Sequence, residues 1–264
     1  MQSDATRMIE KNSEIVYADG HCHLVPEWFD YDEVVRVTRK AMSSSVKYIV
    51  NSAIEAKHYD FGLKTGELPG VFLSVGLDTT KVTKESVEEL KNFHLENLDK
   101  TVAIGEIGLD FHWVKEEENR QQQEEFFREL IVFAMEIDKP LVIHSRAAEE
   151  KAIQILKEMG AEEVLMHCFG GTEEQAKEIS RMSWYITVPT SAVYRKNFQK
   201  ILQSVALDSL MFETDSPYHS LQKDKQNDPS SIPILSRHAS KLLEVEERDL
   251  AYITTKNVKD FYRI

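Results

Sequence analysis

The sequence has 264 residues, of which 42% are hydrophobic and 29% charged, and its formal net charge is −13. This is the composition of a globular protein, and a length of about 250 residues suits one (β/α)8 barrel, so we expect a single domain over residues 1–264. The acidic charge argues against binding duplex nucleic acid over a wide surface, although metal ions in a recessed site can still attract a phosphate substrate.

No apolar run in the sequence is long enough to span a bilayer, and residues 1–12 lack the apolar core of a signal peptide. We therefore expect a cytoplasmic protein without a membrane partner. The sequence contains no feature that identifies a protein partner.

Eight short apolar runs alternate with amphipathic stretches along the chain. The runs cover residues 15–18, 46–50, 71–75, 102–104, 141–143, 164–166, 185–188 and 210–212. Each is typical of a buried strand bounded by polar or turn residues. Between the fourth and fifth runs, residues 123–137 carry apolar side chains at helical spacing, and three glutamates at 116–118 suit a helix start.

Nearly continuous apolar strands that alternate with helices indicate a parallel sheet covered on both faces. Eight such units favour an α/β fold of the TIM type, a closed (β/α)8 barrel. An open doubly wound sheet is the structural alternative, but no glycine-rich nucleotide loop follows the first run.

Polar side chains follow five of the eight runs, at the barrel end where catalytic groups are expected. They are His21 and His23 after the first run, Glu106 after the fourth, His144 after the fifth, His167 after the sixth and Asp215 after the eighth. His21 and His23 project from the same side of an extended segment and can share one ion.

Each of these residues alone has an ordinary structural explanation. A lone histidine is typical of a hydrogen-bonded core residue, Glu106 would suit a solvated glycine turn, and Asp215 could cap a helix with Pro217 in its first turn. Together they indicate a metal site, because buried ionisable groups need compensation at five places at once. Six ligands exceed the number that one catalytic zinc takes, which favours two divalent ions about 3.5–4 Å apart. We expect these ions to be zinc, manganese, magnesium or nickel.

The two cysteines, Cys22 and Cys168, are too few for a disulfide framework and lack the CxxC spacing of structural zinc sites. Strand alternation would turn both thiols away from the neighbouring histidines. We predict that both are small buried apolar residues.

Five ordered segments resemble the TatD family of metal-dependent hydrolases, within the amidohydrolase-like barrels. They are DGHCH at 19–23, GEIGLDFH at 105–112, PLVIHSR at 140–146, HCFGG at 167–171 and ETDSPY at 213–218. QNDP at 226–229 and TTKNVKDFY at 254–262 match more loosely. The resemblance covers nearly the whole chain, and the ordered set is far more specific than any one segment.

The resemblance implies metal-dependent phosphodiester hydrolysis, usually deoxyribonuclease activity, with a water activated by two metals. It implies one metal on His21, His23 and Asp215, a second on His144 and His167, and Glu106 between them. Asp215 is the expected general base and acts in catalysis together with Glu106.

Three further residues are candidates for binding the substrate. Arg146 suits a phosphate contact, with a structural ion pair at the barrel rim as the alternative. His112 and His219 are candidates to line the substrate cleft, or else exposed loop histidines.

The sequence departs from the family pattern where substrate would be held. Residues 219–223 and Gln226 differ from it, and residues 187–191 lack a glycine-containing segment. The nearest rival is therefore another hydrolysis on the same barrel, of a lactone, phosphotriester or cyclic amide. Many such enzymes bridge their metals with a carbamylated lysine where this chain has Glu106. A binding module without activity is the other alternative, but it would not need six compatible ligands.

Overall fold

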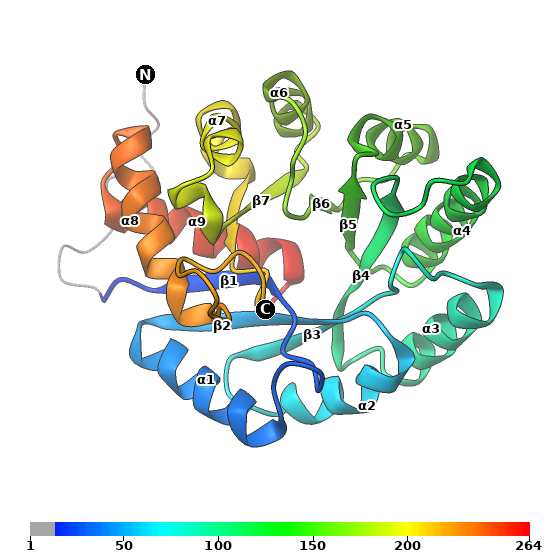
Figure 1. Cartoon of the computed structure of the whole chain (residues 1–264), viewed down its shortest axis with the longest axis horizontal. Helices are drawn as coiled ribbons and strands as arrows, with labels where there is room; N and C mark the ends of the chain where they lie inside the picture. The colour runs from blue at the N-terminus through cyan, green and yellow to red at the C-terminus, as the bar shows by residue number, and fades with distance from the viewer. Residues whose placement is uncertain (1–13) are drawn as a thin grey trace.

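The computed structural model describes residues 14–264, in which eight parallel strands follow one another around a barrel in the order of the sequence (Figure 1). The strands are β1 (Tyr17–Cys22), β2 (Val46–Ala53), β3 (Val71–Val75), β4 (Thr101–Asp110), β5 (Leu141–Arg146), β6 (Val164–Met166), β7 (Tyr185–Pro189) and β8 (Leu210–Glu213). The predicted TIM-type fold is confirmed, and the open doubly wound sheet is excluded.

Helices surround the strands in Figure 1. They are α1 (Tyr31–Ser43), α2 (Ala56–Thr65), α3 (Lys84–Glu96), α4 (Glu117–Glu136), α5 (Glu149–Met159), α6 (Glu173–Arg181), α7 (Lys196–Ser204), α8 (Ile232–Leu243) and α9 (Glu247–Tyr262), with short 3-10 turns η2 (Thr190–Val193), η3 (Leu207–Ser209) and η4 (Pro229–Ser231). Capping boxes begin α1, α3 and α6. The helix predicted from residue 123 begins earlier, at Glu117, and two glutamates lie in its first turn.

Strand β4 continues past the predicted run and contains Glu106, which the glycine-turn alternative had placed outside it. Its pairing with β5 is irregular between Ile104 and Ile107, at the point where Glu106 turns into the barrel mouth. The flanking glycines serve close packing. Gly108 has φ +138, and a Cβ there would lie 2.1 Å from the carbonyl oxygen of His144.

The barrel closes at a seam between the ends of β1 and β8. The amide of His23 donates to Ser216 O at 2.7 Å, and the amide of Asp215 donates to His21 O at 3.0 Å. Buried Asp19 accepts hydrogen bonds from the amide and hydroxyl of Thr214 at 2.8 and 2.5 Å. The backbone therefore fixes the first and last candidate metal ligands relative to each other.

The opposite end of the barrel is filled by an apolar layer that includes the C-terminal helix. Side chains from six strands form this layer together with three from α9: Ala18, Val50, Ala103, Val142, Leu165, Met211, Val258, Phe261 and Tyr262. The hydroxyl of Tyr262 donates to Gly20 O at 2.8 Å. The end of α9 thus closes the floor of the barrel, and the candidate site lies at the other end.

His94 on α3 is fully buried away from the mouth. Its Nε2 lies 3.0 Å from Val75 O and its Nδ1 lies 3.2 Å from Thr101 Oγ1. Burial disfavours the imidazolium and lowers the pKa of His94 to about 4, against 6.5 for an ordinary histidine.

We expect His94 to make the protein less stable in acid. Because the unfolded chain binds this proton first, stability is lost as pH falls from about 6.5 to 4, by about 3 kcal/mol in total. His94→Gln removes that titration, so urea unfolding across this range should show a smaller loss for the variant. Equal losses for the two proteins would contradict the assignment.

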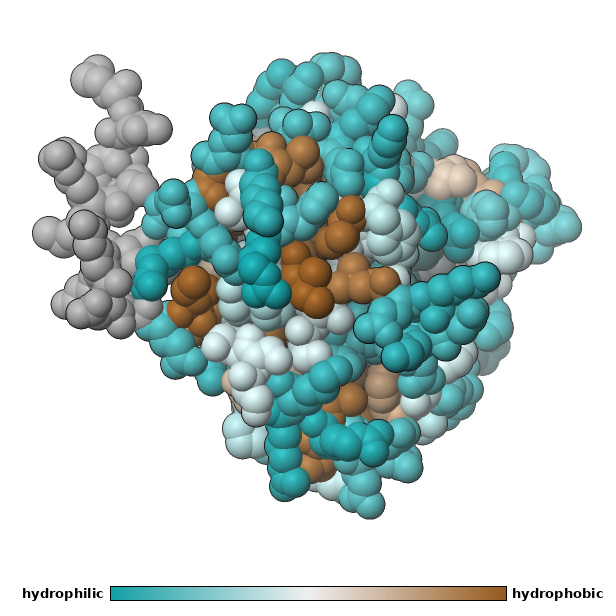
Figure 2. Space-filling model, turned by 60° about the vertical axis from the view of Figure 1, so that its left-hand side comes forward, coloured by the Kyte–Doolittle hydropathy of each residue, from teal (hydrophilic) through white to brown (hydrophobic). Residues whose placement is uncertain are grey.

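None of the helices within residues 14–264 combines the length and the apolar sequence that spanning a bilayer requires. The face of the molecule in Figure 2 carries its hydrophobic residues in small groups between hydrophilic ones. This agrees with the abundance of charged residues in the sequence.

Candidate metal centre

The six candidate ligands meet at the carboxyl end of the barrel. His21 lies on β1 with His23 just beyond it, Glu106 lies on β4, His144 lies on β5, His167 directly follows β6, and Asp215 follows β8. All are buried except His144, which is partly buried. Residues 216–228 contain no helix, so Asp215 does not act as a helix cap.

Glu106 lies at the centre of this group. Its Oε2 is 3.2 Å from His21 Nε2, 3.3 Å from His23 Nε2 and 3.6 Å from His167 Nε2. Its Oε1 is 2.9 Å from His144 Nδ1. Although these nitrogens surround it, buried Oε2 has no hydrogen bond of good geometry. Imidazole nitrogens and carboxylate oxygens that converge on one point are the arrangement that divalent cations fill.

The donor atoms form overlapping groups in which all atoms lie within 4.8 Å of one another. The groups are His21, His23 and Glu106; Glu106, His144 and His167; and His21, His167 and Asp215. Two of these groups share Glu106. The residues therefore fit divalent cations around this carboxylate.

The charges of the site depend on one another. Burial alone would raise the pKa of Glu106, but His167, His144, His21 and His23 outweigh it and hold this pKa well below its usual range. Burial alone would lower the pKa of His144, because it disfavours the imidazolium, yet the contacts with Asp110 and Glu106 raise this pKa to about 10. The histidines around Glu106 therefore keep its carboxylate ionised, which is the form that binds a cation.

A second layer of acceptors orients the histidines, and sequence reasoning missed it. Asp110 Oδ2 lies 3.0 Å from His144 Nε2, and Glu213 Oε2 lies 3.4 Å from His167 Nδ1. The carbonyl oxygen of Ser52 lies 3.0 Å from His23 Nδ1. The sequence contains a sign of this layer, because the segments at 105–112 and 213–218 each carry a second acid besides the candidate ligand. Such outer acceptors fix the ring orientation of metal-binding histidines.

Replacing Asp110 with asparagine should weaken metal binding at His144. The asparagine amide carries no negative charge with which to orient the imidazole of His144. Loss of such an outer partner typically lowers metal affinity by about 10–100-fold. Metal titration of the stripped protein would measure this. Unchanged affinity in Asp110→Asn would show that the contact with His144 is only structural.

The candidate centre opens into a cavity of about 660 Å3. Its walls include Arg146, Arg195, Trp113, Tyr218 and His219. Within residues 14–264, no carboxylate is paired with either arginine, and the guanidinium carbon of Arg146 lies 5.5 Å from the ring centre of Trp113. His112, by contrast, is exposed beside Trp113 and does not line the cavity.

The two cysteines differ in environment. Cys22 is fully buried and its thiol donates to Val50 O at 3.4 Å, which confirms the prediction for this residue. The prediction for Cys168 is wrong, since its side chain lines the cavity and Sγ lies 3.4 Å from His219 Nε2. The reason is that β6 ends at Met166, so strand alternation no longer governs Cys168, whose φ is +44.

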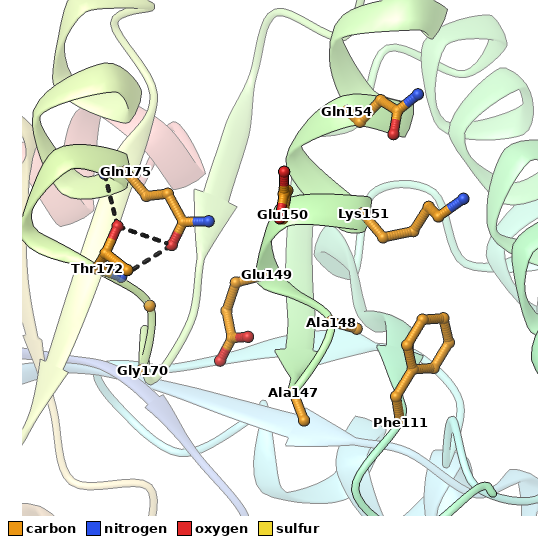
Figure 3. Close-up of a pocket in the computed structure, with 11 residues that line it drawn as sticks. Phe111, Ala147, Ala148, Glu149, Glu150, Lys151, Gln154, Gly170, Thr172 and Gln175 are labelled. Carbon is orange, nitrogen blue, oxygen red and sulfur yellow. Dashed lines mark hydrogen bonds between the residues drawn. The ribbon is translucent and has the colours of Figure 1, made fainter.

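A groove of about 540 Å3 adjoins the cavity (Figure 3). It lies between the starts of α5 and α6, and it shares Glu149 and Gly170 with the cavity. Thr172 and Gln175, which form the capping box of α6, stand on one side in Figure 3. The mouth therefore has room for a substrate that extends beyond the candidate centre.

The barrel and the family match place this protein among the metal-dependent hydrolases built on a TIM-type barrel. More narrowly, the chain belongs to the family described as TatD related DNase, whose profile matches residues 18–263.

Individual relatives agree with the family. The uncharacterized metal-dependent hydrolase YabD of Bacillus subtilis is 33% identical, over 93% of this chain and 98% of its own. The human deoxyribonuclease TATDN3 is 29% identical, over 90% of this chain and 92% of its own. The crystal structure of YJJV, a TatD homologue from Escherichia coli, superposes with a TM-score of 0.85 at 24% identity, covering 94% of this chain and 98% of that one. This last likeness supports the fold.

Proposed function

We propose that the chain is a phosphodiesterase that hydrolyses DNA with two divalent ions bound by His21, His23, Glu106, His144, His167 and Asp215. The observation that carries the substrate class is the pair of arginines on the cavity wall. Arg146 and Arg195 have no carboxylate partner within residues 14–264, although the protein carries a net charge of −13. Guanidinium groups left unpaired beside a cation site suit a phosphate substrate.

The metal ions, when bound, would polarise the phosphoryl group and lower the pKa of the attacking water. The chain itself supplies the proton acceptor. Burial would raise the pKa of Asp215, but His23 and the charge of His167 lower it, so this carboxylate is ionised. It lines the cavity and is the group we propose to accept the proton of the water. Arg146 and Arg195 would hold the phosphate, and Glu106 would fix the two cation positions.

The proposal of DNA also has support outside the arginines. Trp113 and Tyr218 line the cavity and are 63% and 52% exposed, and partly exposed aromatic rings beside a phosphate site suit stacking on bases. The groove beside the cavity would take the rest of a polymer. A relative over most of the chain bears the name deoxyribonuclease. The rival, hydrolysis of a small lactone, phosphotriester or cyclic amide, uses the same cavity but needs neither the groove nor the exposed aromatic rings.

A substrate panel with metal control tests the proposal. We expect chelation to abolish turnover and added manganese, zinc or magnesium to restore it to different degrees. Single-stranded DNA should be shortened from one end, while a lactone and a simple phosphotriester are left intact. An enzyme that ignores DNA but turns over the small substrates would support the rival, and indifference to the chelator would remove the metal mechanism.

A further inference from the structure

We propose that Cys168, Asp215 and His219 form a third cation site, selective for zinc and similar thiophilic ions, next to the two-metal centre. It shares Asp215 with that centre and therefore rests on the proposed function. His219 was predicted to line the substrate cleft or to be an exposed loop histidine, and Cys168 to be a small buried apolar residue.

The donor atoms already have the spacing of a tetrahedral zinc site. Cys168 Sγ lies 3.4 Å from His219 Nε2, and His219 Nε2 lies 3.5 Å from Asp215 Oδ2. Zinc bonds of about 2.0–2.3 Å in tetrahedral directions separate neighbouring ligand atoms by about 3.3–3.6 Å. All three donor atoms lie within 4.8 Å of one another.

Asp215 can serve both sites because its two oxygens face different partners. Oδ1 lies 3.4 Å from His23 Nε2, on the side of the two-metal centre. Oδ2 lies 3.5 Å from His219 Nε2, on the side of Cys168. A carboxylate in this position can bridge two cations, as acids do in sites that hold several metals.

The imidazole of His219 is held with one nitrogen toward the thiol. Its Nδ1 lies 2.6 Å from Ser191 Oγ, and its carbonyl oxygen accepts the hydroxyl of Thr190 at 2.8 Å. Nδ1–H donated to Ser191 leaves the lone pair on Nε2, which faces Cys168 and Asp215. Such a partner on the second nitrogen is the usual companion of a metal-binding histidine.

Cys168 is also held by its backbone. Its amide donates to Thr187 Oγ1 at 2.9 Å, and its left-handed φ of +44 is a conformation that few non-glycine residues adopt. Cys168, Asp215 and His219 all line the cavity of about 660 Å3, so a cation reaches them from solvent. Three protein ligands leave the fourth tetrahedral position to water or to a substrate oxygen.

The thiol decides which cations bind. When a metal–sulfur bond forms, the S–H bond breaks and the proton passes to solvent, while His219 donates the lone pair of a neutral imidazole. Thiolates favour zinc, cobalt and cadmium, whereas magnesium and manganese prefer oxygen. A thiophilic ion here would occupy Asp215 Oδ2 and so impede the proposed proton acceptor. We therefore expect excess zinc, but not excess manganese, to inhibit hydrolysis.

Cobalt absorption gives a test that does not depend on activity. Metal-free full-length protein is titrated with Co2+ beyond two equivalents, and the near-ultraviolet charge-transfer band of a cobalt–thiolate bond is recorded. We expect the band in the wild type, its loss in Cys168→Ser and in His219→Gln, and its retention in the matched control Cys22→Ser, in which the hydroxyl can still donate to Val50 O. Circular dichroism confirms that each variant is folded. No band in the wild type, or a band that survives Cys168→Ser, would overturn the third site.

Zinc inhibition is measured in parallel, relative to each variant's own rate with Mn2+. Cys168→Ser should require at least about tenfold more zinc for half inhibition, because it loses the thiolate ligand. Equal inhibition of wild type and variant would contradict the proposal. The two hypotheses fail separately: a cobalt–thiolate band with no DNA cleavage refutes only the substrate, and DNA cleavage with no band refutes only the third site.

Discussion

Replacement of Glu106 by glutamine should lower turnover by about a thousandfold or more, because this carboxylate faces every histidine of the candidate centre. A glutamine has nearly the same shape, so the barrel is retained. Its amide, however, brings one neutral oxygen and an NH2 group to a place where two anionic oxygens are needed. We expect the variant to bind fewer metal ions per chain, as measured by elemental analysis after dialysis.

Asp78→Asn is the matched control for Glu106. Asp78 is another carboxylate on the cavity wall, but its partners are Thr80 and Lys81 rather than the histidines. Its substitution should leave metal content and turnover close to wild type. Wild-type metal content and rate in Glu106→Gln would refute the assignment of Glu106 as the shared ligand.

Replacement of Asp215 by asparagine should have the second-largest effect, a loss of about 10²–10⁴-fold in turnover. The asparagine carbonyl can still contact the cation site, and the backbone bond from residue 215 to His21 O is unaffected. What disappears is the ability to accept a proton. We therefore expect kcat to fall while metal content remains nearer to wild type than in Glu106→Gln.

Varying the metal concentration distinguishes the proposed role of Asp215 as proton acceptor from that of a residue that only strengthens metal binding. Raising Mn2+ should restore Asp110→Asn, whose defect is affinity, and should leave Asp215→Asn inactive. The comparison uses the same assay and the same change of carboxylate to amide. Full rescue of Asp215→Asn by metal would mean that Asp215 is a ligand and not the proton acceptor.

The strands, and the meeting of the six candidate ligands at the barrel mouth, could be predicted because both depend on local pattern. An apolar run fixes where a buried strand lies, and the residue after it must lie at the barrel mouth. His144 and His167 could be placed in this way without knowledge of any neighbour. Strand β4 was harder, since Gly105 and Gly108 resemble a turn in sequence. Only the structure shows that these glycines allow close approach to Val142 and His144.

The features that sequence reasoning missed depend on contacts between distant residues. Asp110 and Glu213 could not be assigned to His144 and His167 before the register of the strands was known. The orientation of Cys168 depends on where β6 ends and on the left-handed backbone of Cys168 itself, two residues after that end. A period of two predicts side-chain direction only inside a strand, and this thiol lies outside one.

The contacts between helix α9 and the start of the first strand have a consequence for the order of folding. Helix α9 fills the barrel floor, and its bonds from Tyr262 to Gly20 O and from Thr255 to Val16 O span 242 and 239 residues. Contacts this far apart close a large loop and form slowly compared with neighbouring strand–helix units. We therefore expect closure to be a late event. Until α9 docks, the partly folded chain exposes the apolar layer of its own interior and is most open to aggregation at that stage.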